Sequence, residues 1–382
     1  MRIVLFDYVF DRDKPGASGL SDLVWNWASH LTTMGDEVHI VAPYLENARP
    51  PTGAIVHRYA LPPIGYRNIL GHVLIVLWGW LEIRKLGPID LIHSPEYLST
   101  GIFSLLMRRT PVILTVPGSI YERIKNGNPF DWWTTQALKV AARISARFCA
   151  RIIVTSGEMW YWWKKIGTSV SRLTLIPYGV NIDQFHPIPD AKSSLGIPHT
   201  KRIVLYVGRL SHEKGLQYLL PAFQHVARQT SDVQLHVVGD GPLREKLATM
   251  AQDIGIGEKV VFHGWVPQNE LPTFYSAADV VVLPSLSEGL PRTMLEAMAC
   301  SAPFVGTNIS GIRDWVIDGE TGLMAPPADI DGLACCLDRL LYQADYAQQL
   351  GRAASNRIQR DLAWNTITLR IRTEVYLSCV QS

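Results

Sequence analysis

This chain of 382 residues lacks the marks of several protein classes. Its five cysteines are an odd number and none stands at a metal-ligand spacing, which fits a reducing cytoplasm. The longest apolar run, residues 69–81, has 13 residues, whereas a helix needs about 20 to span a bilayer. The first seven residues are too short an apolar run for a signal peptide and predict a strand. The sequence thus indicates a globular protein of the cytoplasm.

A strong overall charge is missing as well, because the net charge is only +2. The charge is unevenly spread, however. Residues 1–178 carry 19 Lys and Arg against 13 Asp and Glu, a net +6, and the remainder carries a net −4. We expect no nucleic acid partner, but the positive first half indicates an anionic partner of another kind.

A complete dinucleotide-binding fingerprint is also lacking. Gly239-Asp240-Gly241 supplies the first two glycines of the Gly-x-Gly-x-x-Gly pattern, but Arg244 stands where the third glycine belongs. This argues against a nicotinamide cofactor.

The elements that are present predict two α/β domains. With 47% hydrophobic residues the chain can bury a large core, and its length exceeds that of a usual single domain. Strand-like apolar runs alternate with helical patterns, which is typical of parallel sheets covered by helices on both faces. The runs are residues 3–6, 38–41, 91–93, 112–116 and 152–155, then 203–207, 234–238, 259–262, 280–283 and 304–306. We expect two Rossmann-like doubly wound domains, with ligands beyond the carboxyl ends of the strands in the cleft between the domains.

The domain boundary is expected where periodicity fades and four prolines occur, in residues 177–200. We assign residues 1–178 to the first domain, residues 179–200 to an interdomain linker and residues 201–360 to the second domain. Residues 361–382 are expected to form a C-terminal helix that packs back on the first domain.

One stretch of the second half, residues 285–300, predicts an anion site. It follows the apolar strand of residues 280–283, and Pro291 suits the first position of the helix expected after it. A helix start offers free N–H groups to a phosphate, and Gly289 lets a ligand approach the backbone. We expect Gly289, Leu290 and Pro291 to contact such a ligand.

Two glutamates in this stretch need a reason, because carboxylates repel a diphosphate. Glu288 and Glu296 can accept hydrogen bonds from neutral hydroxyls, such as those of a ribose and of a second sugar, which together describe a nucleotide-sugar. The alternative is that each acid only complements the helix dipole.

Several motifs occur in the order found in one enzyme family. Glu288 and Glu296 form a Glu-x7-Glu pattern within Glu-Gly-Leu-Pro and Leu-Glu-Ala-Met-Ala. The other matches are Val207-Gly208-Arg209-Leu210, Glu213-Lys214-Gly215, Val238-Gly239-Asp240-Gly241-Pro242, Phe262-His263-Gly264-Trp265-Val266 and Asp318-Gly319-Glu320-Thr321-Gly322-Leu323. Across nearly the whole chain the sequence resembles the family 4 retaining glycosyltransferases of the GT-B fold.

The resemblance implies a hexosyltransferase that moves a sugar from a nucleotide-sugar, such as a UDP- or GDP-sugar, with retention of configuration. The second domain would hold the donor and the first would meet a glycan or lipid-linked acceptor. It also implies that Trp265 and Val266 contact the base chiefly through backbone groups, and that Gly241 belongs to the donor site.

Arg209 and Lys214 are the expected catalytic cations, with Glu288 as the third catalytic residue. Two cations at the mouth of a parallel sheet suit a leaving diphosphate, whose charge grows as the glycosidic bond breaks. A metal ion is then not required, although a solvated loop pair is the alternative. Asp11-Arg12-Asp13 is interpreted as a surface loop rather than the Asp-x-Asp metal motif of the other glycosyltransferase fold.

The first domain should contribute a glycine-rich loop, Gly16-Ala17-Ser18-Gly19, before a helix over residues 20–34. By itself the loop indicates only a turn, but the resemblance implies that Gly16 and Gly19 face the donor diphosphate.

One position departs from the family pattern. Many members carry a histidine near the transferred sugar after the strand of residues 112–116, where this chain has Pro117, followed by Gly118 and Ser119. The sugar contact is either absent or supplied by His93 or Ser94 at a neighbouring strand end, although a histidine at such a position can also be a plain core or rim residue. We place His93, Ser94, Gly118 and Ser119 on the acceptor or sugar side.

A basic and aromatic segment follows. Four cations, Lys139, Arg143, Arg147 and Arg151, recur every four residues and predict one helical stripe, with Trp132 and Trp133 before it and residues 160–165 after it. Trp, Tyr and Lys together suit an interface with an anionic membrane, so we expect a peripheral protein at the inner face of the cell membrane. The alternative is a solvated helix face above core tryptophans.

Two other classes share this architecture. A nucleotide-sugar 2-epimerase would release nucleotide without an acceptor, and a non-catalytic donor-binding membrane scaffold would bind the donor without transfer. The sequence does not name the sugar, the base or the acceptor.

Overall fold

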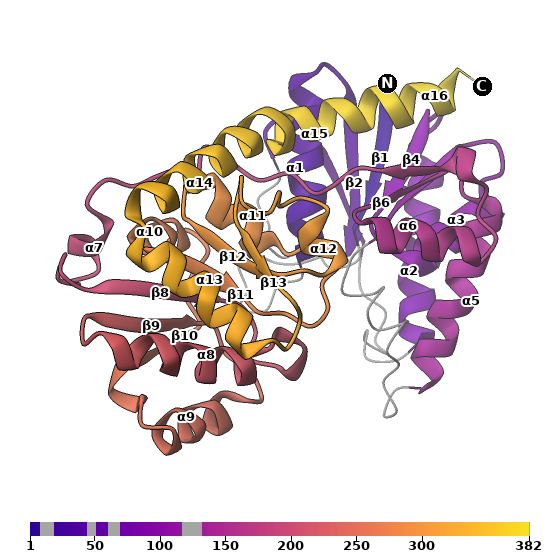
Figure 1. Cartoon of the computed structure of the whole chain (residues 1–382). Helices are drawn as coiled ribbons and strands as arrows, with labels where there is room; N and C mark the ends of the chain where they lie inside the picture. The colour runs from indigo at the N-terminus through magenta and orange to yellow at the C-terminus, as the bar shows by residue number, and fades with distance from the viewer. Residues whose placement is uncertain (8–18, 44–50, 60–68, 117–131, 382) are drawn as a thin grey trace. The chain divides into compact units, whose positions relative to one another are not determined.

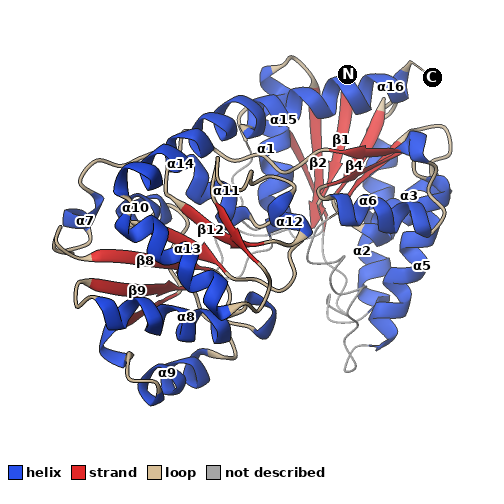
Figure 2. Ribbon diagram, viewed as in Figure 1, coloured by secondary structure: helices blue, strands red, loops and turns tan. Residues whose placement is uncertain are grey.

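The computed structural model describes residues 1–7, 19–43, 51–59, 69–116 and 132–381. The chain divides into two compact units: an N-terminal unit, Met1–Gly179 with Trp364–Ser382, and a C-terminal unit, Val180–Ala363. Each unit is built on one parallel sheet with helices packed around it, as Figures 1 and 2 show. Two Rossmann-like sheets are the architecture that the alternating strands and helices predicted.

The N-terminal sheet has seven strands in the order β3-β2-β1-β4-β5-β6-β7. This order reverses between β1 and β4, the switch point of a doubly wound sheet. The strands are β1 (Arg2–Phe6), β2 (Glu37–Pro43), β3 (Ile55–Tyr59), β4 (Leu91–Ser94), β5 (Val112–Thr115), β6 (Arg151–Val154) and β7 (Leu173–Leu175). The central strands are buried apolar runs and were predicted. The edge strands β3 and β7 were not, because β3 is half-exposed and β7 has only three residues.

Helices of this unit come from both ends of the chain. They are α1 (Gly19–Thr33), α2 (Ile69–Lys85), α3 (Tyr97–Leu106), α5 (Trp132–Phe148), α6 (Gly157–Lys165), η2 (Val170–Arg172), α15 (Trp364–Arg370), η6 (Ile371–Tyr376) and α16 (Leu377–Val380). The C-terminal segment is anchored by charge: Arg372 Nε donates to Asp36 Oδ2 at 2.7 Å, and the amino group of Met1 donates to Oδ1 at 2.9 Å. The Asp36 side chain is fully buried, so both partners compensate a desolvated carboxylate.

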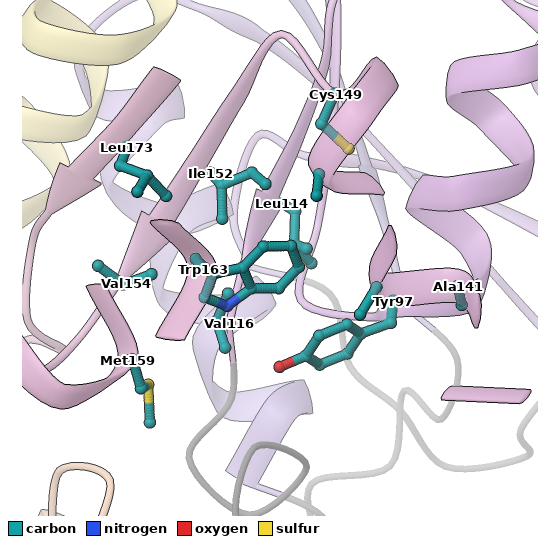
Figure 3. Close-up of a cluster of buried hydrophobic side chains, with 12 residues drawn as sticks. Tyr97, Leu114, Val116, Ala141, Cys149, Ile152, Val154, Met159, Trp163 and Leu173 are labelled. Carbon is teal, nitrogen blue, oxygen red and sulfur yellow. The ribbon is translucent and has the colours of Figure 1, made fainter. Parts of the chain in front are cut away.

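A buried apolar cluster lies between β5, β6 and helices α3, α5 and α6 (Figure 3). Trp163 is fully buried and stacks on Tyr97, with ring centroids 5.6 Å apart. Trp163 is therefore a core residue and not part of an exposed aromatic surface. Trp160 and Trp162 are half-buried against the same cluster, whereas Tyr161 is 66% exposed.

The C-terminal sheet has six strands in the order β10-β9-β8-β11-β12-β13. They are β8 (Arg202–Val207), β9 (Val233–Val238), β10 (Val260–Gly264), β11 (Val280–Leu283), β12 (Phe304–Thr307) and β13 (Leu323–Ala325). Only β13, again three residues long, was not predicted. The helices are α7 (Ala191–Ser194), η3 (His212–Lys214), α8 (Leu216–Gln229), α9 (Arg244–Asp253), η4 (Gly257–Lys259), α10 (Leu271–Ala277), α11 (Arg292–Ala299), α12 (Ser310–Arg313), α13 (Ile330–Tyr342), α14 (Ala344–Arg357) and η5 (Ile358–Leu362).

The segment expected as a linker, residues 179–200, packs on the C-terminal unit from Val180 onward. It contains α7, whose Lys192 Nζ lies 2.8 Å from Asp279 Oδ2 and also donates to the carbonyl of Lys201. Among the described helices, none is both long and apolar enough to cross a membrane.

Candidate functional site

The strongest cluster of predicted site residues lies at the carboxyl ends of β8 and β11. These strands are neighbours in the middle of the C-terminal sheet, with Val280 opposite Val204. The loop after β8 carries Arg209 and Lys214, and the loop after β11 carries Glu288. Because the carboxyl ends of parallel strands meet at one edge of the sheet, residues 74 positions apart are brought into contact.

Lys214 and Glu288 form an ion pair at this edge. Lys214 Nζ lies 2.7 Å from Glu288 Oε1, and Ser285 Oγ donates to the same oxygen at 2.7 Å. The two side chains are only 19% and 7% exposed. Solvent screens such a pair less than a surface pair, so the position of the ammonium group is well defined. The sequence predicted both residues but not their mutual contact, nor Ser285.

Arg209 is the second cation of the cluster and is much more open, with a side chain 67% exposed. Its guanidinium donates to Glu213 Oε1 at 2.6 Å, and Ser211 Oγ donates to that oxygen at the same distance. Burial raises the pKa of Glu213, but the hydrogen bond from Ser211 and the charges of Arg209 and Lys214 outweigh it, so the net pKa is lowered. Glu213 is therefore ionised at neutral pH and holds Arg209 at the loop.

Two glycines bring these loops close together. Gly215 has φ +75°, and a Cβ there would overlap the carbonyl oxygen of Pro284 at the end of β11. Gly241 lies against Leu210, where a Cβ would overlap the backbone oxygen. Only glycine allows both approaches, so the glycines of the sequence motifs fix the spacing between the loops after β8, β9 and β11.

Glu296 lies in α11 and is almost fully buried. Tyr275 donates to its Oε2 at 2.9 Å, and Gln268 Nε2 lies 3.5 Å from Oε1. These partners come from α10 and the loop before it, and no sequence motif indicated them. Pro291 is the residue before α11, with extended ψ 117°, so the helix begins one residue later than predicted.

The remaining donor-side residues of this unit surround the same edge. Gly289 and Leu290 are buried in the loop before α11, and Gly311 packs directly beneath it, where a Cβ would overlap the backbone oxygens of Glu288 and Gly289. Trp265 follows β10 and is 55% exposed, and Val266 is half-buried. An exposed indole at a strand end can contact a ligand.

Most predicted contacts of the N-terminal unit are not described. Gly16, Gly118 and Ser119 lie outside the described residues, as do Pro117 and the Asp11-Arg12-Asp13 segment. Gly19 is the first residue of α1. The side chains of Trp132 and Trp133, at the start of α5, are also outside the description.

His93 and Ser94, at the end of β4, are both fully buried. His93 Nδ1 lies 2.6 Å from the hydroxyl of Tyr376 and Nε2 lies 2.7 Å from Thr115 Oγ1, while the ring stacks on Trp27. Burial lowers the pKa of His93 to about 3, so the ring is neutral. Both ring nitrogens are engaged within the N-terminal unit, and a sugar contact would have to displace one of these partners.

The basic stripe is shorter than predicted. Helix α5 ends at Phe148, and Arg151 is the first residue of β6, so the four cations do not share one helix. Arg143 and Arg147 are exposed on α5, whereas Lys139 is half-buried. The four-residue spacing predicted one helix for all four cations, but the helix ends between Arg147 and Arg151.

Two parallel doubly wound sheets with a cation and glutamate cluster at the strand ends are the arrangement expected of a two-domain glycosyltransferase. Residues 17–184 match Glycosyltransferase Family 4, and residues 187–357 match Glycosyl transferases group 1. The chain belongs to this family of retaining glycosyltransferases with the GT-B fold, which use nucleotide-sugars.

Individual relatives agree with this assignment. The GDP-mannose-dependent alpha-(1-6)-phosphatidylinositol monomannoside mannosyltransferase of Mycobacterium tuberculosis is 30% identical over 368 residues, 94% of each chain. An uncharacterized glycosyltransferase of Methanocaldococcus jannaschii is 30% identical over 356 residues, 89% of each chain. Among solved structures, sucrose-phosphate synthase from Thermosynechococcus elongatus has a TM-score of 0.83 at 25% identity, over 100% of this chain and 99% of that one.

Proposed function

We propose that this enzyme transfers a hexose from a UDP- or GDP-sugar to a lipid-linked or glycan acceptor, without a metal ion. The observation that carries the proposal is the cluster at the ends of β8 and β11. There Lys214 is fixed by Glu288 at 2.7 Å and Arg209 is held by Glu213 at 2.6 Å.

In this proposal the two cations act on the leaving diphosphate. Negative charge grows on the bridging oxygen as the sugar departs, and preorganised cations stabilise that charge more than they stabilise the ground state. Lys214 is partly desolvated, which strengthens its interaction with the diphosphate. Arg209 offers a planar fork of donors that matches phosphate oxygens.

The glutamates would bind the sugars of the donor. Glu296 is turned into the unit and would accept hydrogen bonds from the ribose, with Tyr275 and Gln268 orienting its carboxylate. Glu288 is oriented by Lys214 and Ser285 and would accept hydrogen bonds from the transferred sugar.

The acceptor side is assigned to the N-terminal unit, at an anionic membrane surface at the inner face of the cell membrane. Two observations support a lipid-linked acceptor: Arg143 and Arg147 are exposed on α5, and the mycobacterial relative is named for a phosphatidylinositol glycolipid substrate. The same name supports a GDP-sugar as one of the donors to test.

The test is mass spectrometry of products after incubation with a panel of nucleotide-sugars and of lipid-linked and soluble glycan acceptors, with EDTA present throughout. Transfer in excess EDTA is expected. Activity that is lost in EDTA and restored by Mg²⁺ or Mn²⁺ would overturn the metal-independent mechanism. Nucleotide release that needs no acceptor would indicate a 2-epimerase, and tight donor binding without any product would indicate a scaffold.

Arg209→Ala tests the assignment of the cations. We expect turnover to fall by about 10²-fold, the loss typical of removing one preorganised group that stabilises transition-state charge. The matched control is Arg352→Ala, which removes an exposed arginine from α14 of the same unit and should leave turnover unchanged. A folded Arg209→Ala enzyme with unaltered turnover would contradict the role.

A further inference from the structure

A basic pocket lies at the opposite end of the N-terminal sheet from the strand ends where such folds bind substrates. It opens at the amino ends of β5 and β6, which begin at Val112 and Arg151, and has a volume of about 320 Å³. Its polar lining comes from the end of α3, the turn after it, the start of β6 and the C-terminal segment: Ser104, Arg108, Arg109, Thr110, Arg151 and Cys379.

The pocket is strongly positive. Arg108, Arg109 and Arg151 line it, and no aspartate or glutamate is among the described residues that line it. Within the described chain, none of the three forms an ion pair; Arg151 donates only to the carbonyl of Ala150, at 3.4 Å. Three like charges around one cavity repel one another unless an anion lies between them.

Capping of the nearby helix ends does not explain these arginines. The end of α5 is already served by Arg172, whose Nη1 donates to the carbonyls of Arg147 and Cys149 at 3.0 and 3.2 Å. Past the end of α3 the carbonyl of Met107 already accepts a hydrogen bond from the backbone N–H of Thr110 at 3.0 Å. Among the residues that the structure describes, neither an ion pair nor helix capping accounts for the three arginines that line this pocket.

We propose that this pocket binds the phosphate group of a phosphate ester. Guanidinium groups match phosphate oxygens in geometry and stay charged at all physiological pH values. A volume of about 320 Å³ is near the lower limit of small-molecule sites, so it accommodates a phosphate and part of the group esterified to it. The site is separate from the donor cluster of the C-terminal unit, and it stands whether or not the proposed acceptor is correct.

The experiment is a residue-resolved footprint with phenylglyoxal, which modifies accessible arginines, read by peptide mass spectrometry on the full-length protein. One arm adds inorganic phosphate or glycerol 3-phosphate, against sodium chloride at equal ionic strength. A second arm adds phosphatidylcholine vesicles with or without phosphatidic acid. Arg352, which is exposed on the C-terminal unit, is the control: slower modification there would show that the added anions protect arginines nonspecifically.

We expect modification of Arg108, Arg109 and Arg151 to slow by severalfold with phosphate while Arg352 is unchanged. Protection by the soluble esters assigns a free phosphate ester, and protection only by phosphatidic acid vesicles assigns a lipid headgroup. In Arg151→Gln the phosphate concentration that half-protects Arg109 should rise roughly tenfold, the effect of one lost charge-assisted hydrogen bond. Arg151→Lys, which keeps the positive charge, should restore part of the affinity for phosphate. The proposal would be overturned if, in both arms, the three pocket arginines were protected no more than Arg352.

Discussion

At the residue scale, Glu288 and Glu296 are the same amino acid with different hydrogen-bond partners. Glu288 is paired with a lysine at 2.7 Å, and Glu296 is held by a tyrosine and a glutamine. A carboxylate next to a cation presents little net charge to a diphosphate. Glu296 accepts hydrogen bonds from Tyr275 and Gln268 and is suited to accept further hydrogen bonds from neutral hydroxyls. Their substitution should therefore affect different parts of the donor.

We expect Glu296→Gln to weaken binding of the free nucleoside diphosphate roughly tenfold, because one of the two acceptor oxygens proposed to bind the ribose becomes an amide donor. Glu288→Gln should weaken the intact nucleotide-sugar but not the diphosphate, since it releases Lys214 from its counter-ion. Isothermal titration calorimetry measures both ligands. Glu320→Gln, an exposed glutamate of the same unit, is the control. The reversed pattern would contradict the two roles.

His93 gives a pH-dependent prediction. Its pKa is about 3 in the folded protein and about 6.5 when unfolded, so the unfolded chain binds one more proton between these values. Between pH 6.5 and about 3 the free energy of unfolding therefore falls as the pH decreases, by roughly 1 kcal/mol per pH unit. Urea titrations from pH 7 to 4 should show a shallower decline for His93→Gln than for wild type. Parallel curves would mean that His93 is protonated in the folded state.

Side-chain partners were the part of the site that the sequence could not predict. Arg209, Lys214, Glu288 and Glu296 stand in motifs, because their chemistry and spacing are local properties of the chain. Tyr275, the partner of Glu296, is 21 positions distant and carries no motif. Such contacts depend on how α10 packs against α11, which no pattern within one segment reveals.

At the scale of the element, the turn between η3 and α8 sets the position of Lys214. Gly215 has φ +75° and abuts Pro284, so an added Cβ is strained by the backbone and by overlap. Gly255 has the same φ with nothing within 4 Å, so alanine there meets only the backbone strain of about 1 kcal/mol.

We expect Gly215→Ala to lower stability by more than Gly255→Ala, and to lower turnover as well, because the loop must move away from β11 and carry Lys214 with it. Thermal unfolding and steady-state kinetics of the two variants provide the comparison. Equal destabilisation by both, with full activity in each, would show that the contact with Pro284 is not required.

The strands that the sequence predicted are apolar runs of four to seven residues, most of them buried. The missed strands β3, β7 and β13 are edges or have only three residues, where the apolar signal is too weak to distinguish from a loop. The prediction of the basic stripe was wrong because the signal was too regular. The four-residue period of the cations continues past the end of α5 into β6. Periodicity reports a helix only while the backbone remains helical.

At the scale of the whole molecule, charge is divided between the two halves of the sequence. Residues 1–178 carry a net +6 and the remainder a net −4, and this asymmetry persists although the stripe on α5 is shorter than predicted. Each exposed Lys or Arg near an anionic bilayer contributes about 1 kcal/mol, so Arg143 and Arg147 together contribute about 2 kcal/mol.

We therefore expect the protein to float with vesicles that contain anionic lipid at low salt, and to remain with the soluble fraction when the vesicles are neutral. Salt at about 1 M should release it, because the Debye length falls to about 3 Å. Arg143→Glu with Arg147→Glu should weaken binding at least tenfold. The control is Arg313→Glu with Arg352→Glu, which makes the same charge change on exposed arginines of the C-terminal unit. If both double variants lose binding equally, net charge and not the α5 surface drives it; if wild type never floats, a soluble acceptor becomes the better assignment.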